Sequence, residues 1–70
     1  MTPRDRTLRA RMRALMAAMD DEIEAMLALG TGRDDPAFRA IEARMFAIAE
    51  ATRETAAKIE AGAPYLAPVH

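Results

Sequence analysis

The chain has 70 residues, which is room for one domain with a small core. It has no cysteine and only one histidine, His70, so disulfides, thiolate ligands and a histidine pair for a metal are excluded. Serine, asparagine, glutamine and tryptophan are also missing, so we expect no enzyme, no cofactor and no metal. The net charge is −1.

The composition is typical of a helix bundle. Hydrophobic residues make up 51% of the chain, mainly alanine, leucine, isoleucine and six methionines, whereas aromatic residues make up 4%. No apolar run approaches the roughly 18 residues of a membrane span, and no signal peptide is visible, so we expect a cytoplasmic protein. The strong preference for arginine over lysine indicates a GC-rich genome, and we expect a bacterial or phage-like source.

The first predicted helix runs from Pro3 to Leu29. Thr2 is suited to the N-cap, and Pro3 to the first helical position. At about 100° per residue, the larger apolar side chains cover an arc of roughly 160°, which is wider than the seam between two helices requires. They are Leu8, Met12, Leu15, Met16, Met19, Ile23, Met26, Leu27 and Leu29.

Charge is divided sharply along this helix, with Asp5 as the one acid among five arginines in the first half and acids at Asp20, Asp21, Glu22 and Glu24 in the second. This order opposes the helix dipole. One explanation is antiparallel pairing, with Glu54 and Glu60 of the second helix or with the acidic half of another subunit. The other is a patch that binds nucleic acid or another anion, formed by Arg4, Arg6, Arg9, Arg11 and Arg13.

The stretch 30–35 is predicted to be a turn. Gly30 can close the first helix in the left-handed conformation, and Asp35 before Pro36 is suited to cap the second helix. The turn therefore folds the chain into an antiparallel hairpin.

The second predicted helix runs from Pro36 to Ala61 and is closed by Gly62. Its seam follows the spacing of a coiled coil, with alternating steps of three and four residues. Phe46 lies well over 90° from that seam, as either an exposed or edge-buried aromatic or an anchor into a second helix pair. The seam residues are Phe38, Ile41, Met45, Ile48, Thr52, Thr55 and Ile59.

Residues 63–70 form a proline-rich tail that we expect to be extended. Tyr65 and Leu66 either fold back over the end of the bundle or offer a short linear motif to a partner. Glu22 and Glu42 lie near the edges of the apolar faces, where we expect interface ion pairs rather than metal ligands.

The predicted fold is all-α: residues 1–62 form an antiparallel two-helix hairpin that dimerises into a four-helix bundle or is completed by a partner's helices. Glycine and proline at the turn and two helices of similar length carry this prediction. The expected buried residues are Leu8, Met12, Leu15, Met19, Ile23, Met26, Phe38, Ile41, Met45, Ile48, Thr52 and Ile59.

We expect a non-catalytic interaction or assembly module, such as an accessory subunit, co-chaperone or assembly factor, that self-associates or binds another helical protein. The alternative is RNA binding by a hairpin dimer through the five N-terminal arginines. In overall plan, but in no motif, the chain resembles the small hairpin co-chaperones of type III secretion and the small hairpins that control plasmid copy number. The expected interface residues are Met12, Met16, Met19, Ile23, Leu27, Phe46, Tyr65 and Leu66.

Overall fold

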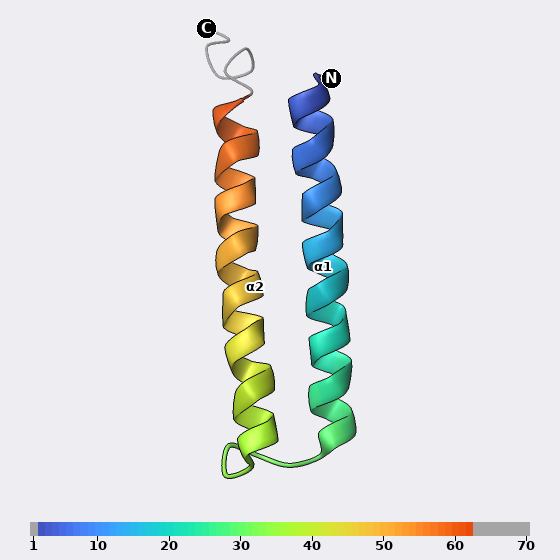
Figure 1. The fold of residues 1–70 in the computed structure, drawn as a ribbon, viewed down its shortest axis with the longest axis vertical. Helices are drawn as coiled ribbons and strands as arrows, with labels where there is room; N and C mark the ends of the chain where they lie inside the picture. Colours follow the sequence, from blue (N-terminus) through green and yellow to red (C-terminus); the bar gives the residue numbers. More distant parts are fainter. Residues whose placement is uncertain (1, 63–70) are drawn as a thin grey trace, which may run out of the picture.

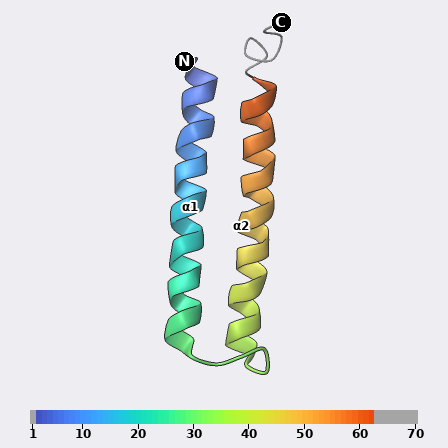
Figure 2. The same ribbon diagram turned by 180° about the vertical axis from the view of Figure 1, so that it is seen from behind.

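Two long helices lie side by side and antiparallel, joined by a short turn (Figures 1 and 2). The computed structural model describes residues 2–62. Helix α1 spans Pro3–Leu29 and α2 spans Pro36–Ala61, the ranges that the caps and glycines predict, and no strand occurs in this part of the chain. The expected extended tail, with Tyr65 and Leu66, lies outside the described residues.

Each helix begins at a side chain that caps its exposed amides. The Thr2 hydroxyl accepts a hydrogen bond of 3.1 Å from the backbone N–H of Asp5. The Asp35 carboxylate accepts a hydrogen bond of 2.8 Å from the N–H of Ala37 and another of 3.0 Å from the hydroxyl of Thr31. In both helices the residue after the cap is a proline, which has no N–H to leave unpaired.

The two helices end in different ways. Gly30 has φ 67°, the left-handed conformation expected of it, and its N–H donates to the Met26 carbonyl at 3.4 Å. Gly62 caps α2 at φ −86°, so it needs no left-handed backbone there. A Cβ on Gly62 would lie 2.9 Å from Nη1 of Arg4. The guanidinium of Arg4 at the start of α1 therefore lies beside the end of α2.

A single seam holds the helices together. On α2, all seven predicted seam residues, from Phe38 to Ile59, are at least partly buried, which confirms the spacing of three and four. On α1 the same spacing gives Leu8, Met12, Leu15, Met19, Glu22, Met26 and Leu29. The carboxylate of Glu22 thus occupies a seam position that an apolar side chain would normally fill.

The predicted core is less buried than expected. Within residues 2–62 only Ile41 and Thr55 are buried, at 6% and 2% exposure, and Thr55 was not among the predicted core residues. Ile23, which was expected to be buried, is 40% exposed because it lies one residue beyond the seam. The others in the predicted core are half-buried. The cause is geometric, since a hairpin is one layer, 14 Å across its shortest axis, and each helix covers only one stripe of the other.

Small side chains close the seam near the open end of the hairpin. The hydroxyl of Thr55 donates to the Ala51 carbonyl at 2.7 Å, and that of Thr52 donates to the Ile48 carbonyl at 2.7 Å. These bonds satisfy both hydroxyls within α2, so the threonines can face α1 without leaving a polar group unpaired.

Ion pairs flank the seam where Glu22 and Glu42 lie, as expected. Nε of Arg44 lies 3.0 Å from Oε1 of Glu22 and joins the two helices. Nη2 of Arg33 in the turn lies 3.0 Å from Oε2 of Glu42. Both carboxylates are partly buried, with 20% and 28% of the side chain exposed. They are therefore better shielded from solvent than an ordinary surface ion pair.

The expected pairing of the N-terminal arginines within the hairpin is wrong. In the described residues no ion pair joins any of the five to Glu54 or Glu60. All five arginines are exposed, and the guanidinium of Arg4 lies next to Gly62 at the end of α2. Neither α1 nor α2 has a stretch long and apolar enough to cross a membrane, and the cytoplasmic location stays a prediction.

Replacing Gly30 by alanine should lower the free energy of unfolding by about 1–2 kcal/mol, because a Cβ is strained in the left-handed conformation. Gly32→Ala is the matched control two residues away: its φ is not positive and a Cβ would meet nothing within 4 Å. We expect that control to be neutral or stabilising by up to about 1 kcal/mol. Urea unfolding followed by circular dichroism, at equal protein concentrations, checks both, and equal losses would contradict the assigned turn.

The Glu22–Arg44 pair should couple the two helices measurably. In a double-mutant cycle with Glu22→Ala and Arg44→Ala, we expect a coupling energy of about 0.5–1 kcal/mol. The control cycle uses Glu50 and Arg53, which lie 3.4 Å apart within α2 with side chains 72% and 70% exposed. We expect a coupling of less than about 0.5 kcal/mol there. An equal or larger coupling in the control would show that the seam position of Glu22 brings no advantage.

Candidate protein interaction surface

One broad side of the hairpin is formed by two stripes of side chains that border the seam. On each helix the stripe follows steps of three and four residues, so its members share one side of that helix. We call the side that they form the apolar side, after its central residues. The α1 stripe is Arg6, Arg9, Arg13, Met16, Asp20, Ile23 and Leu27, and the α2 stripe is Arg39, Glu42, Phe46, Ala49, Arg53, Ala56 and Glu60.

Two adjoining hollows show that both stripes face the same way. One, of about 430 Å³, is lined by Met16 and Asp20 from the α1 stripe and by Ala49 and Arg53 from the α2 stripe. The other, of about 330 Å³, is lined by Met19, Met26, Glu42, Met45, Phe46 and Ala49. The hollows share two lining residues, so together they form one groove between the helices.

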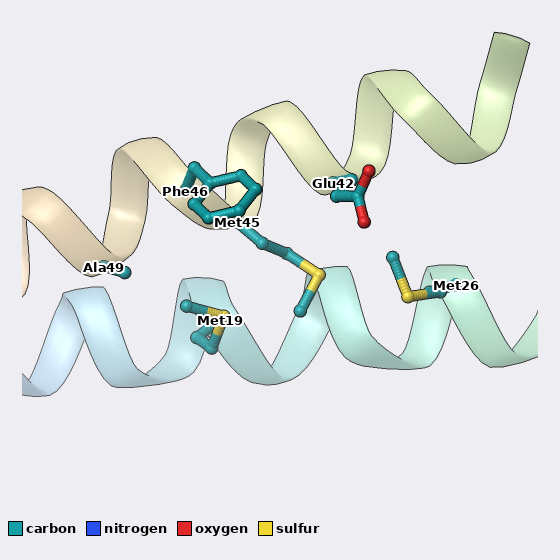
Figure 3. Close-up of a pocket in the computed structure, with 6 residues that line it drawn as sticks. All are labelled: Met19, Met26, Glu42, Met45, Phe46 and Ala49. Carbon is teal, nitrogen blue, oxygen red and sulfur yellow. The ribbon is translucent and has the colours of Figure 1, made fainter. Parts of the chain in front are cut away.

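Methionine side chains form the floor of this groove. Those of Met19, Met26 and Met45 reach into the space between α1 and α2 (Figure 3). All three belong to the seam, yet none is fully buried by the other helix. Unbranched and polarisable, they can adapt to the shape of whatever covers them.

Large apolar side chains are exposed on the apolar side, where Met16 and Phe46 line the groove and Ile23 and Leu27 continue the α1 stripe toward the turn. Met16 is 60% exposed, Ile23 40%, Leu27 75% and Phe46 68%. Single exposed apolar residues are ordinary, whereas neighbouring ones that continue into an apolar groove mark an interaction surface. The structure therefore brings together Met16, Met19, Ile23, Leu27 and Phe46 from the predicted interface.

The predicted interface and the residues that line the groove differ in two respects. Met12 is half-buried in the seam, where it packs between the helices. Asp20 and Arg53 were not predicted to lie at the interface, although both line the groove, and Glu42, which was expected there only as an ion-pair residue, lines it too. Their signal was present in the sequence, because each lies three or four residues from an apolar member of the same stripe.

The reverse side of the hairpin differs in character. Its positions are alanines interspersed with charged residues such as Arg11, Asp21 and Lys58, so it offers little apolar area for a partner to cover. Within residues 2–62, the large exposed apolar side chains are thus confined to the apolar side. These alanines are Ala14, Ala18, Ala25 and Ala28 on α1 and Ala37, Ala40, Ala47 and Ala51 on α2.

The five N-terminal arginines do not form one patch. Their spacing places Arg6, Arg9 and Arg13 on the apolar side, and Arg4 and Arg11, seven residues apart, on the reverse side. All five are exposed. Nη1 of Arg4 lies beside Gly62, at the carbonyl end of α2, where the helix dipole favours a cation.

The described residues contain no candidate metal site. Across residues 2–62, no three His, Cys, Asp or Glu residues gather closely enough to hold a metal ion. The groove is lined by methionine, phenylalanine and alanine, with one carboxylate at the edge of each hollow. Such a surface can exclude water from an apolar partner and orient it through the charges at the rim.

Comparison of the chain with models of known protein families, with curated proteins and with solved structures found no match. The candidate interaction surface is therefore argued from the residues of this chain alone.

Proposed function

We propose that the protein is a non-catalytic interaction module that binds a helical partner through its apolar side. The observation that carries the proposal is the exposure of Met16, Leu27 and Phe46 around a methionine-floored groove on one side of the hairpin. A chain that acted alone would have little reason to keep a phenylalanine 68% exposed beside such a groove.

The shape of the groove favours a helix as the occupant. It follows the boundary between two antiparallel helices, so a helix or helix pair can lie along it and place side chains every three or four residues into the hollows. Accessory subunits, co-chaperones and assembly factors bind partners in this way, and we place the chain among such proteins.

Nucleic-acid binding remains the second candidate from the sequence, and the arrangement of the arginines favours it less than a single patch would. Two of the five lie on the reverse side, which divides the positive charge. The described helices also place no aromatic side chain among these arginines on which a base could stack.

A photo-reactive phenylalanine analogue placed at position 46 should form a covalent adduct with the partner in the cells that naturally make the chain. We expect a discrete adduct from position 46, and another from position 27, because both side chains are exposed on the apolar side. The adducts are identified by mass spectrometry, and an adduct with a second copy of the chain counts as a partner.

The matched control places the same analogue at position 47, because Ala47 is exposed and lies on the reverse side of α2. We expect no discrete adduct from this position. Equal labelling from all three positions, or none from 46 and 27, would show that the apolar side is not an interaction surface.

A further inference from the structure

We infer that the partner on the apolar side is a second copy of this chain, packed antiparallel so that α1 lies on α1, α2 lies on α2, and the two turns are at opposite ends. This inference rests on the proposed function and names its partner. It is carried by the order of charges along the two stripes of the apolar side.

The height of each residue along the hairpin follows from two contacts between the helices. Glu22 pairs with Arg44, and Arg4 lies beside Gly62. Since the helices are antiparallel, moving one residue toward the C-terminus of α1 corresponds to moving one residue toward the N-terminus of α2. By this relation Arg13 lies level with Arg53, and Asp20 lies level with Phe46.

Charge on the apolar side differs between the two ends of the hairpin. Toward the open end the side carries Arg6, Arg9, Arg13 and Arg53 against one acid, Glu60. Toward the turn it carries Asp20 and Glu42 against Arg39, and Arg33 of the turn pairs with Glu42. One end is therefore strongly basic, whereas at the other the charges nearly balance and Asp20 has no ion pair within residues 2–62. Inverting one copy end for end separates the two basic ends and sets the arginines of each over the end that holds Asp20.

The antiparallel dimer has a two-fold axis that lies between the two copies, at right angles to the helices. When this axis passes close to Met16, it brings the complementary residues opposite one another. On α1 it sets Arg13 against Asp20 of the other copy. On α2 the same axis sets Arg39 against Glu60. The pair on α1 alone sets the position of the axis, and the pair on α2 then follows from the same axis without adjustment.

The same axis also covers exposed apolar side chains. It places Phe46 opposite Arg53 of the other copy, where the guanidinium can stack on the exposed ring. It places Leu27 opposite Arg6, whose aliphatic stem can cover it. Met16 meets its own counterpart near the axis.

The parallel alternative, with both turns at one end, brings like charges together. There α1 of one copy lies on α2 of the other, so residues of equal height meet and Arg13 faces Arg53. The basic ends would overlap along their whole length, which is unfavourable without counter-charges between them.

The available area suits a stable dimer. With helices of 27 and 26 residues, rising about 1.5 Å per residue, and a hairpin 21 Å wide, the broad side measures roughly 800 Å². That is about the area that each partner contributes to a typical specific interface. The dimer would be a four-helix bundle whose centre contains the methionines of the groove.

Charge reversal at Arg13 and Asp20 tests this pairing. The purified chain should be a dimer by light scattering after size exclusion, across a dilution series. Arg13→Asp and Asp20→Arg should each raise the dissociation constant about tenfold or more, because each converts two attractive pairs into two repulsive ones. Mixing the two variants should restore the affinity to within a few-fold, since the mixed dimer regains both attractive pairs.

Both residues are exposed, so circular dichroism should show the helices of each variant intact. A mixture that binds no more tightly than the single variants would overturn the antiparallel pairing. A dimer tightened by Arg13→Asp would do the same, because that result is expected of the parallel arrangement, in which Arg13 faces Arg53.

Disulfide formation gives a second measure that does not depend on charge. The chain has no cysteine, so Met16→Cys and Leu27→Cys each introduce a single thiol at an exposed position. We expect Met16→Cys to form a disulfide-linked dimer on mild oxidation, because it lies near the axis, and Leu27→Cys to form far less. Equal linking of both variants would contradict the axis.

The outcomes separate this inference from the proposed function. If the purified chain is a monomer at every concentration while position 46 labels another protein in cells, the second copy is wrong and the interaction surface stands. If it is a monomer and position 46 labels nothing, both are wrong.

Discussion

The structure depends on one seam between two helices. Hydrophobic burial acts only where the helices touch, and a hairpin one layer thick has a single such line. Thr55 and Ile41 lie on it and are buried, whereas Phe46 lies off it and is not. The exposed groove is therefore a consequence of the architecture: the apolar arc of α1 is wider than one neighbouring helix can cover.

The order of charge along α1 makes sense only in relation to other helices. Arginines at the start of a helix and acids near its end oppose its own dipole. In the hairpin, Arg4 lies at the carbonyl end of α2, where a cation is favourable. Arg6, Arg9 and Arg13 on the apolar side form no ion pair within residues 2–62, and an inverted second copy would supply Asp20 to Arg13.

A carboxylate in the seam suggests how the register of the hairpin is selected. Glu22 pairs with Arg44 across the helices, so sliding one helix by a turn would leave a partly buried charge without its counter-ion. The methionines nearby would accept such a slip easily, because they are flexible. Local structure adds a second constraint, since Gly30 and the Asp35 cap fix the length of the connection.

The sequence by itself determined both helices, their ends and the spacing of the seam, because caps, the left-handed Gly30 and steps of three and four act over a few residues. It also indicated that Phe46 lies outside the seam. Only the tertiary structure decided which flank of each helix shares a side with the other, and so which charges accompany the apolar groove. Whether Ile23 or Glu22 takes the seam position, and whether Arg13 and Arg53 lie level, depends on the rotation and register of one helix against the other, which contacts between distant residues set.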